Sequence, residues 1–166
     1  MQYIILTLAS VIALSGNIQA PIISSSVNSP TQSSITRDTR ADRIDAYFEA
    51  RSMPLAGFGE KFVEEADRCG LDWRLLPAIG VRESSGGKRL MNNNPFGWGS
   101  AKIYFANFDE AIEVVTSNLC GENQNTARYY ADNDYMTKLY WFNGTVLPSY
   151  PAEVEFIMEM IEETEV

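Results

Sequence analysis

A break in helical character near the middle of the chain most constrains its fold. The stretch "AIGVRESSGGKRLMNNNPFGWGS", residues 78–100, opens as an apolar helical run and places one acidic residue, Glu83, at the end of that run. The adjacent glycines and the Asn-Pro step that follow favour turns and cannot continue a helix. The sequence therefore predicts helices on both sides of a central irregular segment. The Glu83 carboxylate lies where the first of these helices ends.

Apolar periodicity predicts the helices that flank this break. The expected helices lie within residues 42–53, 57–70, 73–84 and 108–119, in one or two short segments after residue 126, and from about 152 onward. Asn107 is expected to cap the helix of residues 108–119, with Glu110 completing a capping box. The β-rich run at residues 101–108 can form one arm of a hairpin. The predicted fold class is therefore mostly α, with at most a small β-hairpin beside the cleft.

The first 40 residues are expected to precede the folded domain. Residues 1–20 hold a short apolar core followed by small and polar residues, which suits a cleaved signal peptide and is too short to span a bilayer. Residues 21–40, rich in Ser and Thr, are interpreted as a flexible leader, and residues 41–166 as one folded domain. We expect a secreted chain of the periplasm or cell wall, without stable membrane insertion after cleavage. An uncleaved anchor, or a wrongly assigned start of the chain, is the alternative.

Composition narrows the chemistry that the domain can perform. The chain has a net charge of -9 and no histidine. Ser-His-Asp and Cys-His catalysis are therefore excluded, as is any His-ligated metal site. No cluster of Lys and Arg follows the pattern of a nucleic-acid interface, so no nucleic-acid partner is expected. Carboxylates, tyrosines and amides remain for the chemistry, and we expect a monomer with no metal and no cofactor.

The two cysteines, Cys69 and Cys120, both lie near the ends of predicted helices. In an exported chain they can form a disulfide, which would stabilise the fold by about 4 kcal/mol in the chain-entropy model. Two buried free thiols are the alternative, because the sequence does not reveal whether the two Cα atoms come close enough.

Glu83 is the first candidate catalytic residue. A carboxylate at the C-terminal end of an apolar helix lies at the negative end of the helix dipole and beside apolar neighbours, and both favour its protonated form. A protonated carboxylic acid can act as the general acid that protonates a glycosidic oxygen. The amides and aromatic rings that follow suit a sugar ligand, because amides can bond N-acetyl groups and rings can stack on a pyranose. A solvated surface glutamate is the alternative.

The order of these residues resembles a known family. The segment "AIGVRESSGGK" followed by "NNNPFGW" is similar to the bacterial endo-β-N-acetylglucosaminidase-like domains of the lysozyme superfamily, in which a helix-ending Glu-Ser precedes an Asn-Asn-x-Phe-Gly turn. The resemblance extends more loosely from about Ala41 to "FNGTVLPSYPAEV". It implies a lysozyme-like helical domain that hydrolyses β-1,4 bonds of N-acetylated glycan strands, with Glu83 as the acid. The implied partner is peptidoglycan or a chitin-like oligosaccharide.

The segment after Glu83 is the expected sugar-binding surface. We predict that it forms a turn beside the acid and holds an N-acetyl sugar by amide hydrogen bonds and aromatic stacking. The predicted substrate-binding residues in this part of the chain are Ser84, Asn93, Asn94, Phe96 and Trp98.

Tyrosines nearer the C-terminus are candidates for a second group at the site. The segment "FNGTVLPSYP" looks like the Tyr-Asn-x-Gly and later Tyr segments of related lytic transglycosylases, in which tyrosines line the cleft beside the acid. Phe142 replaces the first of those tyrosines, and Tyr150 matches the second. Tyr150 is therefore predicted to be catalytic and to face Glu83. Asn143 and Tyr130 are predicted to bind substrate. Tyr130 is also the alternative to Tyr150 as the tyrosine that faces Glu83. Core packing is the alternative for these rings.

No second carboxylate stands out as a partner for Glu83, although most glycosidases use two. Helix capping or a solvated helix face explains the other acids considered: Glu60, Glu64, Glu65, Asp109 and Glu110. The 2-acetamido group of the substrate, or a water held by a tyrosine, would remove the need for a second acid. Retaining and inverting mechanisms both stay open.

Two other functions also remain open. The missing second acid favours a non-catalytic module that binds cell-wall glycan without turnover. A lytic transglycosylase is the other functional hypothesis. Phe142 and the absence of the Gly-Leu-Met-Gln turn of the transglycosylases, whose place "NNPFGW" takes, argue against it.

Overall fold

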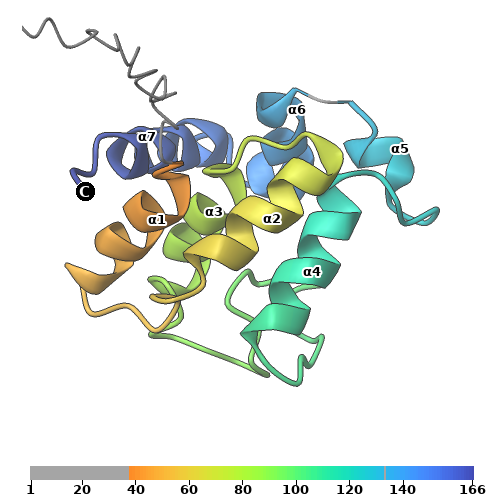
Figure 1. Cartoon of the computed structure of the whole chain (residues 1–166). Coiled ribbons are helices and arrows are strands. Elements are labelled where there is room, and N and C mark those ends of the chain that lie inside the picture. Colours follow the sequence, from red (N-terminus) through yellow and green to blue (C-terminus); the bar gives the residue numbers. More distant parts are fainter. Residues whose placement is uncertain (1–37, 133) are drawn as a thin grey trace, which may run out of the picture. The chain divides into compact units, whose positions relative to one another are not determined.

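The computed structural model describes residues 38–132 and 134–166, and these residues form a mostly helical structure (Figure 1). The elements are α1 (Arg40–Glu49), α2 (Gly59–Cys69), α3 (Leu75–Ser84), α4 (Phe108–Leu119), α5 (Ala127–Tyr130), α6 (Tyr135–Leu139), the π-helical turn η1 (Tyr140–Gly144) and α7 (Tyr150–Glu162). The predicted mostly-α fold class is therefore confirmed.

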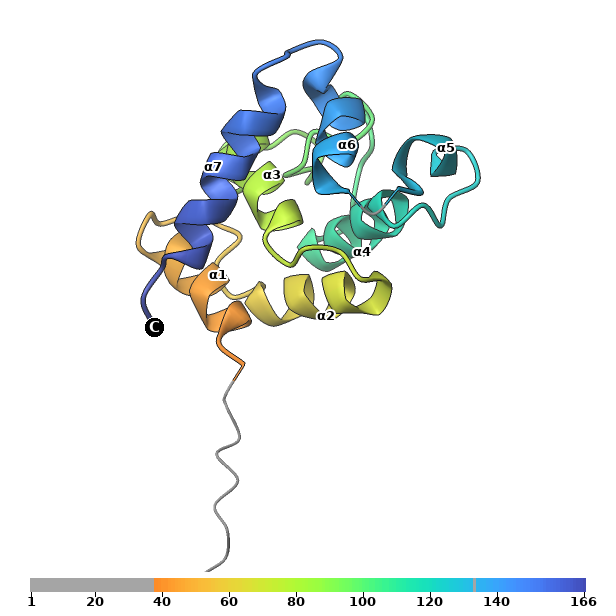
Figure 2. The ribbon, with the colours of Figure 1, turned by 90° about the horizontal axis from the view of Figure 1, so that it is seen from above.

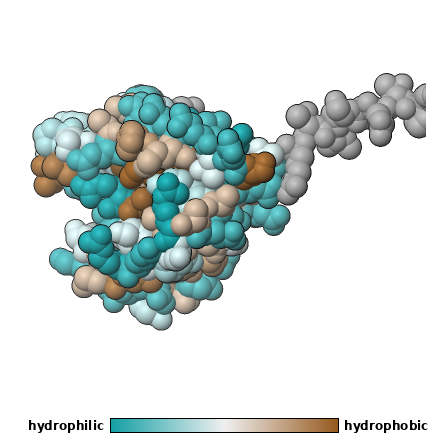
Figure 3. All heavy atoms as spheres, turned by 90° about the vertical axis from the view of Figure 1, so that its left-hand side faces the viewer, coloured by the Kyte–Doolittle hydropathy of each residue, from teal (hydrophilic) through white to brown (hydrophobic). Residues whose placement is uncertain are grey.

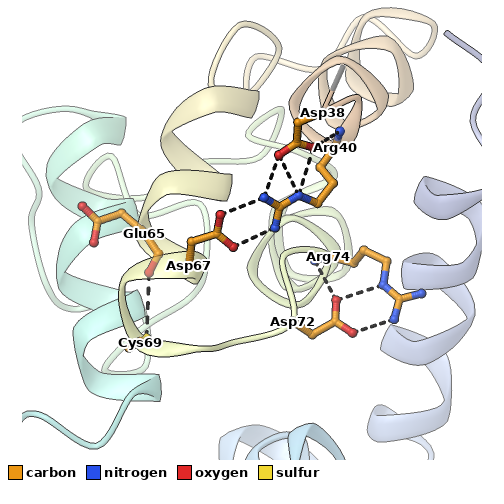
Figure 4. A network of polar contacts seen from close by, with 7 residues as sticks. All are labelled: Asp38, Arg40, Glu65, Asp67, Cys69, Asp72 and Arg74. Carbon is orange, nitrogen blue, oxygen red and sulfur yellow. Dashed lines mark hydrogen bonds and ion pairs between the residues drawn. The ribbon is translucent and has the colours of Figure 1, made fainter. Parts of the chain in front are cut away.

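The N-terminal boundary of the folded part differs slightly from the predicted one. The predicted signal peptide at 1–20, and the leader as far as residue 37, lie outside the described residues. Arg40, expected in the leader, is the first residue of α1. Its guanidinium bonds the carboxylates of Asp38 and Asp67, with nitrogen to oxygen distances of 2.7 Å to each (Figure 4). These ion pairs tie the start of α1 to α2.

Helix α3 lies at the centre of the described structure. Figure 2 shows it enclosed by α1, α2, α4, α6 and α7. Its buried residues are Leu75, Leu76, Pro77, Ala78, Ile79, Gly80 and Ser84. A helix that is apolar nearly all round belongs in a core, and α7 packs along it with the most extensive contact of any helix pair. Because α3 begins only at Leu75, Pro77 falls within its first turn, where proline is tolerated.

Helices α2 and α4 are joined by a disulfide at their C-terminal ends. Cys69 and Cys120 are bonded, with their Cα atoms 5.9 Å apart, a normal separation for a disulfide. At the other end of α4, the Asn107 side chain accepts a hydrogen bond from the Glu110 N–H at 2.9 Å, as a capping residue does. The Glu110 carboxylate accepts a hydrogen bond from Ala106 N–H at 2.5 Å. It thus reaches one residue beyond the capping residue.

The loop between α3 and α4 contains no strand, so the hairpin allowed for at residues 101–108 does not form among the described residues. The amide nitrogens of the preceding asparagines donate to its carbonyls instead. Asn92 donates to Ala101 O at 3.0 Å, and Asn93 donates to Phe105 O at 3.1 Å. Buried or crowded backbone carbonyls need such partners, and side chains here supply what a second strand would have supplied.

The surface is mostly polar, as the net charge of -9 suggests. Figure 3 shows hydrophilic residues over most of one face, with hydrophobic residues in separate small groups. No helix in residues 38–132 and 134–166 has both the length and the hydrophobicity needed to cross a bilayer.

Candidate active site

Two adjoining pockets form a cleft between the α3–α4 loop and residues 126–145, which include α5 and η1. The first has a volume of about 560 Å³ and is lined mainly by aromatic residues. The second has a volume of about 300 Å³ and contains Glu83 and Asn143. Gly97, Ser100 and Phe142 line both pockets. The two spaces therefore form one cleft with an aromatic end and an acidic end.

Glu83 is placed by the last turn of α3. Its side chain is half-buried and lines the smaller pocket. Helix α3 ends one residue later, because Ser85 adopts a left-handed conformation with φ of 56°. The neighbouring Arg82 does not neutralise Glu83, since its Nε lies 2.5 Å from the carboxylate of Glu153. Among the described residues, no basic side chain forms an ion pair with Glu83.

Gly97 lies directly against the Glu83 carboxylate. It has a φ of 63°, a left-handed conformation in which glycine carries no steric cost. A Cβ atom at this position would lie 2.8 Å from Glu83 Oε2. Only glycine therefore leaves both the backbone path and the space beside the acid open.

Tyr150, the first residue of α7, lies close to Glu83 but lines neither pocket. Its ring is fully buried and stacks on Phe142, with ring centroids 6.0 Å apart. Burial raises the pKa of the Tyr150 phenol, and the nearby negative charge of Glu83 raises it further. In the described part of the chain, the Tyr150 hydroxyl is the one buried side-chain polar atom without a hydrogen bond of normal geometry. The structure thus brings Tyr150 and Glu83 together, while the catalytic role of Tyr150 stays a prediction.

Two of the predicted sugar-binding residues, Phe96 and Ser84, are buried with their side chains away from the cleft, and the prediction for them is therefore corrected. Phe96 is 0% exposed and packs in the core against Phe62. Ser84 is 2% exposed, and its hydroxyl donates to Gly80 O and accepts from Gly87 N–H. Neither side chain can contact a ligand in the cleft.

The amides of Asn93 and Asn94 bond the backbone of their own loop. This corrects the prediction for Asn94, which is buried, while substrate binding by the half-buried Asn93 stays a prediction. Asn94 is 3% exposed, and its amide nitrogen donates to Trp98 O at 2.8 Å while its oxygen accepts from Trp98 N–H. The Asn93 amide nitrogen is bonded to Phe105 O, and neither asparagine lines the cleft. These amides hold the shape of the wall beside Glu83.

The remaining predicted binding residues do line the cleft. Trp98 and Tyr130 lie in the aromatic pocket, with ring centroids 5.9 Å apart, and Asn143 lies in the pocket of Glu83. Burial raises the pKa of Tyr130 to about 12, so its hydroxyl stays protonated at neutral pH. Their contact with substrate stays a prediction.

Other carboxylates do not supply a second acid in the cleft. Among the described residues that line either pocket, Glu83 is the only carboxylate. Asp109 is exposed at the start of α4, and Glu110 serves the cap. Glu65, expected on a solvated helix face, is instead 5% exposed and is paired with Lys61 and Arg68. In residues 38–132 and 134–166, no three acidic or thiol groups gather as metal ligands would.

Among the aromatic residues of the cleft, sequence reasoning missed Tyr129 and Trp141. Both line the aromatic pocket, and their ring centroids are 5.1 Å apart. The only available signal was the doubling of aromatic residues in "RYY" and "YWF". Paired aromatic residues of this kind occur equally in cores, so the sequence did not distinguish the two possibilities.

Comparisons of this chain with known protein families, with curated proteins and with solved structures found no match. The account of function therefore rests on the cleft itself and on the motif around Glu83.

Proposed function

We propose that this protein is a secreted glycan hydrolase that cleaves β-1,4 bonds of N-acetylated glycan strands, with peptidoglycan as the strand. One observation carries the proposal. The half-buried Glu83 carboxylate lines the cleft and has no basic partner among the described residues, and the hydroxyl of buried Tyr150 lies close enough to Glu83 for its charge to raise the tyrosine pKa. Polar groups in such positions cost stability unless a ligand completes their hydrogen bonds.

Glu83 would act as the general acid. It donates its proton to the glycosidic oxygen as the bond from C1 to that oxygen breaks, and the leaving sugar departs with a hydroxyl group. The Tyr150 phenol is protonated near neutral pH, as an unshifted phenol also is, and its raised pKa keeps it protonated at higher pH. Because it is fully buried and lines neither pocket, it can act only through Glu83, by donating a hydrogen bond to the carboxylate left after proton transfer.

As the glycosidic bond breaks, positive charge develops at C1, and a second group must stabilise that charge. The substrate can provide this group. No second carboxylate lines the described cleft, which favours attack by the sugar's own 2-acetamido oxygen. That attack forms a cyclic intermediate. Water then opens the intermediate and returns its proton to Glu83. Asn143 lines the same pocket and carries an amide that can hold the acetamido group in place.

A non-catalytic glycan-binding module is the second candidate, and the single acid of the described cleft favours it. An enzyme without a second carboxylate depends wholly on the substrate or on water for the second step. A binding protein would need neither. A lytic transglycosylase also works with one acid, but it ends on an anhydro sugar rather than on a new reducing end.

Product analysis separates these possibilities. The full chain is incubated with purified peptidoglycan and with a hexamer of β-1,4-linked N-acetylglucosamine in H₂¹⁸O, and the products are identified by mass spectrometry. We expect shorter strands with new reducing ends that carry one ¹⁸O atom. Anhydro ends without ¹⁸O would instead identify a transglycosylase, and binding without any product would identify a module.

A further inference from the structure

The aromatic end of the cleft has the character of a ligand site. Its volume of about 560 Å³ lies within the range of small-molecule pockets, about 300 to 1,000 Å³. The rings that line it belong to Trp98, Tyr129, Tyr130, Trp141 and Phe142. Two threonines and one serine add hydroxyl groups, and none of the described lining residues is charged. The pocket therefore suits an uncharged ligand with apolar faces and hydroxyl groups.

The five rings divide into an inner set and an outer pair. Trp98 packs against Tyr130 and Phe142, with centroids 5.9 and 5.6 Å apart, and Tyr130 is only 5% exposed. This inner set is fixed by the core and forms the back wall. Of the outer pair, Tyr129 is half-buried and Trp141 is exposed, and the two rings contact each other. Tyr129 also joins the inner set through Tyr130, with ring centroids 6.4 Å apart.

The outer pair is held in place but left accessible. The Arg128 guanidinium lies over the Tyr129 ring, 4.5 Å from its centroid, and limits its movement. Trp141 belongs to the π-helical turn η1, a kind of turn that is frequent at functional sites. The tryptophan is 42% exposed. A large apolar ring that lines a pocket and stays in water gains free energy when a ligand covers it.

We propose that Tyr129 and Trp141 form a stacking subsite for an uncharged N-acetylhexosamine residue of the strand whose bond is cleaved at Glu83. The proposal rests on the proposed function, because it takes the ligand to be the same glycan. The shared residues Gly97, Ser100 and Phe142 make the cleft continuous, so one strand can occupy both ends. Binding energy at the aromatic end then fixes which bond of the strand lies beside the acid.

The test measures binding separately from turnover. A hexamer of β-1,4-linked N-acetylglucosamine is titrated calorimetrically into the full chain carrying Glu83→Gln, which prevents cleavage. Adding Trp141→Ala is expected to weaken binding by about tenfold, the scale of a truncated aromatic anchor. Trp141→Phe should recover most of the affinity, because a ring is retained. Phe156→Ala removes another ring, 60% exposed on α7 and outside both pockets, and should leave binding unchanged.

The possible results distinguish the subsite from the proposed reaction. Equal affinity with and without Trp141→Ala would overturn the subsite, and so would a chain that binds no hexamer. If hexamer binding depends on Trp141 but the wild-type chain releases no product, the subsite stands and the proposed hydrolysis fails. If the wild-type chain cleaves the hexamer and Trp141→Ala changes neither binding nor the lengths of the products, the hydrolysis stands and the subsite fails.

Discussion

Glu65 on α2 is buried and Glu83 on α3 is half-buried, and the surroundings of the two carboxylates differ. The Glu65 carboxylate is bonded by Lys61 Nζ at 2.7 Å and by Arg68 Nε at 3.0 Å, one cation at each oxygen. No cation among the described residues forms an ion pair with Glu83, since the adjacent Arg82 is paired with Glu153. Glu83 faces a pocket, a glycine and a buried tyrosine hydroxyl without a hydrogen bond.

The difference separates an acid that serves the fold from one that is available to a ligand. Burial alone would raise the pKa of Glu65, but the hydrogen bonds from Lys61 and Arg68 together outweigh it and hold that pKa below its usual value. Glu65 therefore stays ionised and bonded. The polar groups around Glu83 leave hydrogen bonds unmade, and such groups are retained in proteins where function requires them.

The largest expected effect among the variants that probe this contrast comes from Gly97→Ala. A Cβ atom 2.8 Å from Glu83 Oε2 must displace the carboxylate, and a displacement of about 1 Å can reduce turnover by about 100-fold. Gly70→Ala is the matched control. Gly70 also has a positive φ, 72°, but a Cβ there meets no atom within 4 Å. Both variants should lose about 1 kcal/mol of stability from the backbone, measured by thermal unfolding.

Turnover of the hexamer, corrected for the folded fraction, distinguishes the two glycines. Equal turnover in the Gly97 and Gly70 variants would mean that the space beside Glu83 is not needed.

Tyr150→Phe should reduce turnover by about tenfold, because it removes the one hydroxyl that faces Glu83 from α7. The melting temperature should stay equal or rise slightly, since the variant also removes a buried polar atom that has no hydrogen bond. Tyr104→Phe, at a tyrosine that is 68% exposed, is the control for loss of a hydroxyl. A Tyr150→Phe chain with normal turnover and a lowered melting temperature would make this tyrosine purely structural.

Glu65→Gln should have the smallest effect, and only on stability. Loss of the carboxylate leaves Lys61 and Arg68 without their partner, but both cations reach solvent, so we expect a loss of about 1 kcal/mol. Turnover per folded molecule should not change. The measurement is the free energy of unfolding in urea.

The difference in unfolding free energy between the wild type and Glu65→Gln should depend on pH. The pKa of Glu65 is lowered in the folded state, so ionised Glu65 contributes stability above the usual value of 4.5, and this contribution is lost as pH falls through the folded pKa. The difference between the wild type and Glu65→Gln should therefore be constant near neutral pH and shrink below about pH 4.5. A difference that grows in acid would contradict the ion pairs.

The regular part of the fold could be predicted from local signals. Gly70 ends α2, and Asn107 caps α4 with the expected acceptor geometry, because caps depend on residues only a few positions apart. The burial of Glu65 could also have been predicted from its position in the sequence. It shares the helical spacing of Phe62, Ala66 and Cys69, which together mark the inward face of α2.

The cleft was predictable only in part. Glu83 and Tyr150 were placed by motif order, whereas Asn94 and Phe96 were assigned to the ligand although they support the loop. An asparagine that bonds a sugar and an asparagine that bonds its own loop look the same in the amino-acid sequence, because their neighbouring residues can be identical. Which carbonyl it reaches depends on how residues 98–105 fold back, and this is a property of the whole loop.

The proposed function depends on Glu83, and not Glu65, acting as the general acid. The most direct test is the rate of hexamer cleavage by Glu83→Gln beside that of Glu65→Gln, each per folded molecule. We expect Glu83→Gln to lose about 100-fold or more in rate with an unchanged melting temperature, and Glu65→Gln to keep the wild-type rate with a lowered one. A Glu83→Gln chain that cleaves the hexamer at close to the wild-type rate would contradict the account.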